Sequence, residues 1–204
     1  MELLIVASVL VIIISLLNPS LRRIIQKSKD LSCTNNLRNI YTSIQAYADD
    51  QDHFLPGPVW YGQKANIMTT DISRFNNLSE YLVPYFPEPL ISKTGIKYNP
   101  VFICDTNSEM DLSSPNYSRV NYRTNYIKNF GIPFGRKANG QLPKKVTDLP
   151  QTEGFLLQDA DDINYPYYLH EMPDYPIHSN LTRNTLFANG RVEATGEELK
   201  VIDP

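Results

Sequence analysis

One dense group of side chains that could bind a ligand is acidic. Asp159, Asp161 and Asp162 lie within four consecutive residues. Carboxylate oxygens are the hard ligands that Ca²⁺ prefers, so this group is a candidate calcium site. The alternative is a solvated acidic turn, which is the commoner meaning of so short a pattern. We favour the turn, because the spacing also departs from the EF-hand loop, and we keep Ca²⁺ as the candidate cofactor.

The two cysteines, Cys33 and Cys104, stand far apart in the chain. In an oxidising compartment they could form a disulfide, which would stabilise the fold by about 4 kcal/mol in the chain-entropy model. Two buried thiols are the alternative, because free cysteine is commonly a core residue. We favour the disulfide. The cysteines and histidines are too few and too scattered to predict a zinc site.

The three histidines, His53, His170 and His178, do not point to an enzyme. A hydrolase needs a histidine beside a nucleophile and a carboxylate, and the sequence contains no nucleophile elbow, Walker loop, dinucleotide fingerprint or zinc-protease motif. We predict that the chain is not an enzyme, and that His178 forms hydrogen bonds near the base of a C-terminal hairpin. The net charge of -3 gives no reason to expect a nucleic-acid partner.

The elements that position these residues are set by an uneven distribution of apolar side chains. Leu3 to Leu17 reads LLIVASVLVIIISLL, without a charge. A helix that is apolar on every side needs lipid or other helices around it, and extension to Leu21 brings it close to the roughly 20 residues that span a bilayer. We assign membrane insertion and helix packing to its large side chains: Leu3, Leu4, Val6, Val9, Leu10, Ile13, Leu16 and Leu17.

Simpler explanations of this segment account for less of it. A cleaved signal peptide would begin with basic residues and end in small ones, a plain anchor gives Glu2 no role, and a buried core helix would keep a polar face. A carboxylate at the edge of lipid is costly without a partner, so we expect Glu2 to meet a cation of a neighbouring subunit. Pro19 removes a helical hydrogen bond and permits a kink.

Residues 1–23, MELLIVASVLVIIISLLNPSLRR, resemble the N-terminus of type IV prepilins and type II secretion pseudopilins. A prepilin-processing-associated family is similar in two further segments: Cys33-Thr-Asn-Asn-Leu, and His178 followed by Asn189-Gly190. That family has Asp in place of Asn189, and one residue fewer between the histidine and this Asp. The resemblance implies that Glu2 neutralises the methylated N-terminal amine of an adjacent subunit, and that Pro19 is the helix-breaking proline.

The resemblance also implies where the protein acts and with what. Its partners would be other pilin or pseudopilin subunits, inner-membrane lipid, and prepilin peptidase if a leader precedes Met1. A basic leader ending in Gly-Phe is not seen before Glu2, so either it lies upstream or the chain is not processed. The family places a single span in the bacterial inner membrane and the body in the periplasm, or outside the cell in a filament. The positive-inside rule applied to Arg22 and Arg23 alone would favour the opposite orientation.

Beyond the apolar segment the pattern is that of an α+β protein. A spacing of 4, 3, 4 and 3 along Cys33, Leu37, Ile40, Ile44 and Tyr47 predicts one face of a helix, which makes a helix from Glu2 to about Ala48 roughly 70 Å long. We therefore predict a protruding apolar half, a packed amphipathic half and a small antiparallel sheet with extended loops, as in pilins.

The predicted organisation has three parts and a few local elements. They are a membrane and assembly helix at 1–21, its amphipathic continuation at 22–52 and a loop-rich body at 53–204. In the body we predict a short helix at 73–82, strands at 101–104 and 155–158, and a hairpin at 184–195. Asn189-Gly190 predicts a two-residue type I′ turn for that hairpin.

Two functions fit these features. The first is a structural subunit of a type IV pilus or type II secretion-like filament, polymerised through the apolar helix. The alternative is a membrane-anchored binding module, whose helix is only a tether and whose body holds a glycan or protein ligand. Aromatic side chains would supply that binding surface: Tyr165, Tyr167, Tyr168 and Tyr175.

Overall fold

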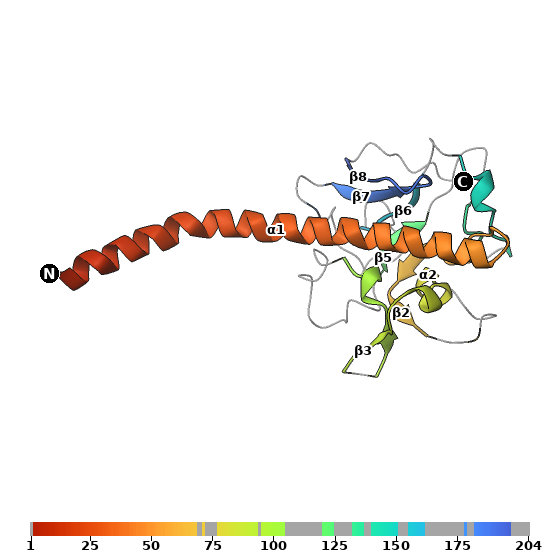
Figure 1. Cartoon of the computed structure of the whole chain (residues 1–204), viewed down its shortest axis with the longest axis horizontal. Coiled ribbons are helices and arrows are strands. Elements are labelled where there is room, and N and C mark those ends of the chain that lie inside the picture. Colours follow the sequence, from red (N-terminus) through yellow and green to blue (C-terminus); the bar gives the residue numbers. More distant parts are fainter. Residues whose placement is uncertain are drawn as a thin grey trace.

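A computed structural model describes residues 2–68, 71, 77–93, 95–104, 120–124, 132–136, 140–150, 155–161, 178 and 182–196. The fold is α+β, with a long N-terminal helix and an antiparallel sheet, as the sequence predicts. The helix runs alongside a body made of two sheets and several short helices, and its N-terminal half extends away from that body (Figure 1).

Helix α1 is continuous from Glu2 to Asp50. Its 49 residues correspond to roughly 73 Å at 1.5 Å per residue. The body lies beside only the C-terminal part of this length (Figure 1). The helix passes through Pro19 without ending, which differs from the helix-breaking role that the family resemblance implies. Among the described residues, no helix combines the length and apolar composition needed to cross a membrane.

The C-terminal half of α1 packs on the body through a single face. Its members are the fully or almost fully buried Cys33, Leu37, Ile40, Ile44 and Ala48. These residues recur every three or four positions, so they line one side of the helix. Leu37, Ile40 and Ile44 belong to the main hydrophobic core together with residues of the larger sheet, and Tyr98 of the smaller sheet packs against it. The face therefore agrees with the predicted one, in which the partly buried Tyr47 lies at the margin.

The chain turns sharply after α1. Asp52 and His53 have φ angles of 50° and 66°, in the left-handed region that non-glycine residues seldom adopt. The amide of His53 donates to the carbonyl of Ala48 at 2.8 Å, which satisfies one of the last carbonyls of the helix. This turn sends the chain back along the body to Phe54, which forms a β-bridge with Lys145.

The larger sheet has five antiparallel strands in the order β1-β5-β6-β7-β8. The strands are β1 (Gly62–Lys64), β5 (Val120–Thr124), β6 (Phe155–Asp159), β7 (Arg183–Phe187) and β8 (Val192–Thr195). Strands β7 and β8 contact α1 directly. Strand β6 coincides with the strand that its apolar run predicts, whereas the polar sequence of β5 gives no such signal.

A smaller sheet and several short helices complete the body. The sheet order is β2-β4-β3, with β2 (Asn66–Ile67), β3 (Leu90–Ile91) and β4 (Lys97–Tyr98). The helices are α2 (Leu78–Tyr81) and the 3₁₀ turns η2 (Val83–Tyr85), η3 (Pro100–Phe102) and η7 (Val146–Asp148). Helix α2 lies inside the predicted helix at 73–82, of which residues 73–76 are outside the described part.

The strand predicted at residues 101–104 is wrong. Residues Pro100–Phe102 form the 3₁₀ turn η3 instead. Asn99 precedes it, and its side-chain oxygen accepts a hydrogen bond from the amide of Val101 at 3.1 Å. Pro100 also has no amide hydrogen to give to a strand ladder. The apolar run is buried because Phe102 and Cys104 reach the core from a turn rather than from a strand.

The C-terminal hairpin has a longer turn than its sequence predicts. The amide of Phe187 donates to the carbonyl of Arg191, and that of Gly190 donates to the carbonyl of Phe187. Gly190 alone of the Asn189-Gly190 pair has a positive φ, 82°, so the two-residue type I′ turn is wrong and a three-residue loop is present. The physical reason is the burial of Ala188. The side chain of Ala188 belongs to the hydrophobic core, and the longer loop allows it to reach the core.

Candidate functional site: the two faces of helix α1

The outward face of α1 carries a stripe of exposed apolar side chains. It consists of Val6, Ile13, Leu17, Ile24 and Leu31, each about half exposed or more. Their spacings of 7, 4, 7 and 7 keep them on one side of a helix with 3.6 residues per turn. Leu21 and Ile25 are exposed as well, about 60° and 100° around the helix from Ile24. At about 100° per residue the stripe lies about 160° from the buried face, on the far side from the body.

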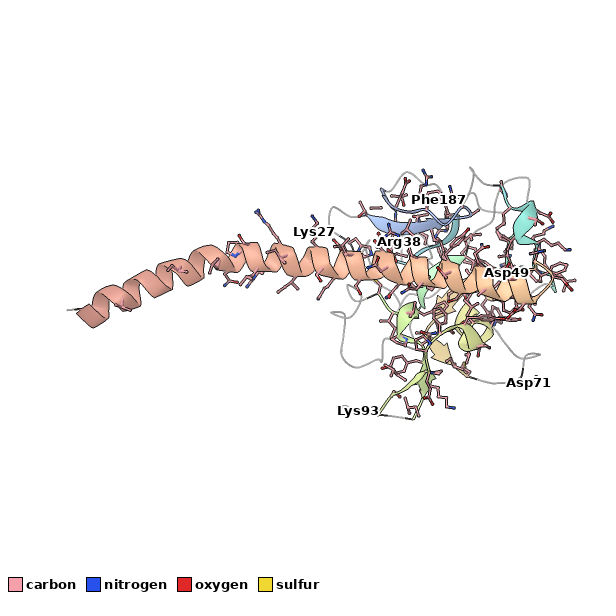
Figure 2. All side chains as sticks on the ribbon, in the orientation of Figure 1. Lys27, Arg38, Asp49, Asp71, Lys93 and Phe187 are labelled. Atoms are coloured by element: carbon pink, nitrogen blue, oxygen red, sulfur yellow. A yellow bond between two sulfur atoms is a disulfide. The ribbon has the colours of Figure 1, made fainter. Side chains whose placement is uncertain are left out.

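The outward stripe ends where the helix joins the body. Figure 2 shows α1 meeting the body between Lys27 and Arg38, and Leu31 is the last apolar member of the stripe. Further along the same side, the exposed positions are polar: Asn35, Arg38, Thr42 and Asp49. The apolar outward face is therefore confined to the protruding half of the helix and the first turns beside the body.

The inward face is fixed to the body by a disulfide at the point where burial begins. Cys33 and Cys104 are bonded at an S–S distance of 2.04 Å, and both are fully buried. Two hydrogen bonds lie close by: Asn36 Nδ2 donates to the carbonyl of Ile103 at 2.9 Å, and Thr34 Oγ1 donates to Asn184 Oδ1 at 3.4 Å. The helix is thus tied to the segment directly after η3 and to β7, at the point where it meets the body.

Beside the disulfide, His178 lies between two carboxylates. Its Nδ1 is 2.8 Å from Asp30 Oδ1 on α1, and its Nε2 is 2.7 Å from Asp159 Oδ2 at the end of β6. The backbone amide of Asn184 on β7 also donates to Asp159 Oδ2, at 2.6 Å. We call Asp30, His178, Asp159 and Asn184 the neck clasp, because they join α1 to the sheet where the helix leaves the body.

The neck clasp favours a charged histidine. Burial disfavours the imidazolium form of His178, but hydrogen bonds and charge from Asp159 and then Asp30 outweigh burial and raise the pKa of His178 above its usual 6.5. Both ring nitrogens then donate, one to each carboxylate. Nε2 also lies 2.8 Å from the side-chain amide of Asn184, whose oxygen has to face the ring in this charged form. The clasp is a charge-assisted pair of hydrogen bonds, the stronger kind, in a largely buried setting. This agrees with the structural role predicted for His178.

The neck clasp and the disulfide together do not make a metal centre. The sulfur atoms of Cys33 and Cys104 and a ring nitrogen of His178 lie within 4.8 Å of one another. The thiolate is the form of cysteine that binds metals, and here the two sulfurs are bonded to each other. The ring nitrogens of His178 are engaged by Asp30 and Asp159.

The predicted calcium ligands have protein partners. Asp159 accepts hydrogen bonds within the neck clasp, and both oxygens of Asp161 face Arg183, at 2.5 Å from Nε and 3.0 Å from Nη2. Both carboxylates are almost fully buried, so neither belongs to a solvated acidic turn. Asp162 lies outside the described residues. The calcium site stays a prediction, in which Ca²⁺ would compete with Arg183 and His178 for these oxygens.

The other predicted site residues are placed only in part. Pro19 is exposed on α1. The backbone of Glu2 is in the helix, but its side chain is outside the described part, as are those of five assigned packing residues: Leu3, Leu4, Val9, Leu10 and Leu16. Tyr165, Tyr167, Tyr168 and Tyr175, the aromatic surface proposed for the binding module, also lie outside it.

Comparison with protein-family models, with characterised proteins and with solved structures gives no match to this chain. The resemblance of residues 1–23 to prepilins therefore stays a prediction.

Proposed function

We propose that this chain is a structural subunit of the pilin or pseudopilin kind, which polymerises with copies of itself through α1. The observation that supports the proposal is the apolar outward face of α1, which reaches Leu31 and then becomes polar. The body cannot cover this face, because it packs on the opposite side of the helix. A partner outside the chain has to cover it.

A neighbouring copy of the same helix suits the outward stripe well. Apolar residues at spacings of 7 and 4 form the seam along which two helices pack side by side. Burying one large apolar side chain contributes about 1.5–3 kcal/mol, so five such residues on each helix supply a substantial driving force for association. In the proposed filament, residues 1–21 also sit in the inner membrane before assembly, and Glu2 neutralises the N-terminal amine of the adjacent subunit.

The disulfide supports the compartment that this proposal requires. Bonds such as Cys33–Cys104 persist in oxidising environments, among them the bacterial periplasm and the cell exterior. We propose that the body lies there and that α1 anchors it to the membrane as a single pass. Prepilin peptidase is then a partner if a leader precedes the chain.

Cross-linking at two positions of α1 tests the proposal. Ile24 lies in the outward stripe, whereas Arg22 is exposed about 160° away around the helix. In membranes of cells that make Ile24→Cys, mild oxidation should give disulfide-linked dimers. The matched control Arg22→Cys should give few. Equal yields from both positions, or no dimer from either, would contradict side-by-side packing through this face.

Glu2 separates the subunit from the alternative of a tethered binding module. Glu2→Ala should leave the protein in the membrane and remove it from filaments, since the carboxylate sets the register between copies. In a tethered module, an unrelated transmembrane helix could replace residues 1–21 with function intact. Normal filament assembly by Glu2→Ala would refute the role given to Glu2.

A further inference from the structure

The larger sheet has a polar face on the side away from the core. Arg123 on β5 pairs across the sheet with Gln158 on β6, and Gln158 pairs with Thr185 on β7. Side chains of paired residues lie on the same face of a sheet. Tyr122, the neighbour of Arg123 in sequence, points to the opposite face and joins the hydrophobic core.

Arg123 is buried on this face with hydrogen-bonding capacity to spare. Its side chain is among the largest fully buried ones, and the residue is 1% exposed. Nε and Nη2 donate to Gln158 Oε1 at 3.1 and 2.6 Å, and Nη1 donates to the Tyr61 hydroxyl at 3.2 Å. A guanidinium has five N–H groups. Three are used, and no described residue accepts from the other two.

The partners of Arg123 are neutral. Gln158 Nε2 donates to Thr185 Oγ1 at 2.9 Å and to Thr195 Oγ1 at 3.3 Å, which fixes its amide with the oxygen toward Arg123. The ring of Phe155 lies 4.9 Å from the guanidinium carbon, where a cation–π contact adds a modest attraction. In the described part of the chain, no carboxylate lies at ion-pair distance from Arg123.

A second arginine on the same face, Arg183, has a carboxylate partner, whereas Arg123 has none among the described residues. Arg183 is two residues before Thr185 on β7, and it forms a two-pronged ion pair with Asp161. That carboxylate pairs directly with Arg183, and it acts on Arg123 only through its charge. Burial lowers the pKa of Arg123, but arginine stays protonated in proteins. Among the described residues, this face is left with one buried positive charge in excess, a costly arrangement unless an anion is present.

We propose that Arg123 is the anchor of a binding site for a small carboxylate, held by the two N–H groups from which no described residue accepts a hydrogen bond. The planar guanidinium matches the two oxygens of a carboxylate. In the described part of this face, two arginines and one aspartate leave a single surplus positive charge. A carboxylate monoanion would neutralise that charge, whereas a phosphate dianion would exceed it. Since Arg123 is 1% exposed, the group has to be small. This site does not depend on the proposed filament.

Formate is a suitable probe, because it is the smallest carboxylate. The thermal midpoint of the full-length protein in detergent micelles would be followed by the fluorescence of Trp60, the single tryptophan. Formate should raise the midpoint relative to chloride at equal ionic strength, because a ligand that binds only the folded state stabilises it. Arg123→Met should abolish the rise, and Arg123→Lys should reduce it, because lysine keeps the charge but not the fork.

The exposed Arg38 provides the matched control, so Arg38→Met should keep the full response to formate. The carboxylate could be a free acid or a side chain of a second copy. In the second case, the midpoint of the wild type should rise with protein concentration in the absence of formate, and formate should reduce that dependence. A rise of the thermal midpoint that requires Arg123 supports the site. A rise with added formate indicates a free acid as the ligand, and a rise with protein concentration indicates a side chain of a second copy.

A measurement on the wild type covers the case in which the Arg123 variants fail to fold. The Nε–Hε NMR signal of Arg123 should shift and saturate as formate is added, while the corresponding signal of Arg183, already paired with Asp161, should stay in place. The proposal is overturned if the Arg123 signal responds neither to formate nor to protein concentration, or if all arginine signals shift together in proportion to added salt.

Discussion

Neutralising Asp30 should weaken the neck clasp and change how stability depends on pH. In the wild type, a carboxylate oxygen of Asp30 lies 2.8 Å from His178 Nδ1. In Asp30→Asn, the amide oxygen of the asparagine can take that position, so the shape is kept and the charge is lost. A hydrogen bond to a charged group contributes about 1.5–3 kcal/mol. Because Asp30 is 21% exposed and Asp159 remains in place, we expect a loss of about 1–2 kcal/mol.

The effect should depend on pH with a definite sign. The folded-state pKa of His178 is raised above the unfolded value of 6.5. The clasp therefore contributes fully below pH 6.5, and its contribution is lost as the pH rises through the folded-state pKa. In Asp30→Asn the pKa of His178 should fall toward its ordinary value. The difference between wild type and variant should thus be largest in mild acid and shrink in alkali.

Urea unfolding of the full-length protein in detergent, followed by Trp60 fluorescence between about pH 5.5 and 9, measures both effects. The control is Asp49→Asn, which removes an exposed carboxylate of the same helix and should give a difference that is constant with pH. A constant difference for Asp30→Asn as well, or an NMR titration that places the His178 pKa below 6.5, would refute the charged clasp.

Other predictions concern the ties between α1 and the sheet. Replacing Cys33 and Cys104 together by Ala should lower the free energy of unfolding by about 4 kcal/mol in the chain-entropy model, and a reducing agent should then destabilise the wild type but not the variant. Gly190→Ala should cost about 1–3 kcal/mol, because its Cβ would lie 2.5 Å from the Tyr41 ring at a φ of 82°. Gly140→Ala is the control, with a φ of 67° and open space around it, and should cost only the backbone strain, about 1 kcal/mol. Urea midpoints of the two glycine variants should differ accordingly, and equal midpoints would mean that the contact with Tyr41 is unimportant.

The long helix was predictable because its signal is local. A run without charges, followed by apolar residues every three or four positions, fixes both the helix and the face that packs from Cys33 to Ala48. The outward stripe was less evident, because Ile24 and Leu31 stand among charged residues. They stand out only once the structure shows which side of the helix the body covers.

The neck clasp was not predictable as a unit, because its members come from distant parts of the chain. Asp30 and His178 are 148 residues apart, and nothing in the sequence around Asp30 marks it as a partner. A weak signal was present in β7, where Asn184 takes an inward position that an apolar residue would normally fill. The unmatched Arg123 was missed for a related reason, since the polar sequence of β5 did not indicate a buried strand.

The geometry of α1 has a consequence for the order of events in the life of the protein. Its outward stripe and its buried face are on opposite sides of one continuous helix, and no described residue belongs to both. Mutational effects at separate sites without shared partners add independently. If the chain assembles as proposed, a newly made copy would therefore reach its final shape alone, before it meets another copy. Joining and leaving a larger structure would then require no refolding of the body.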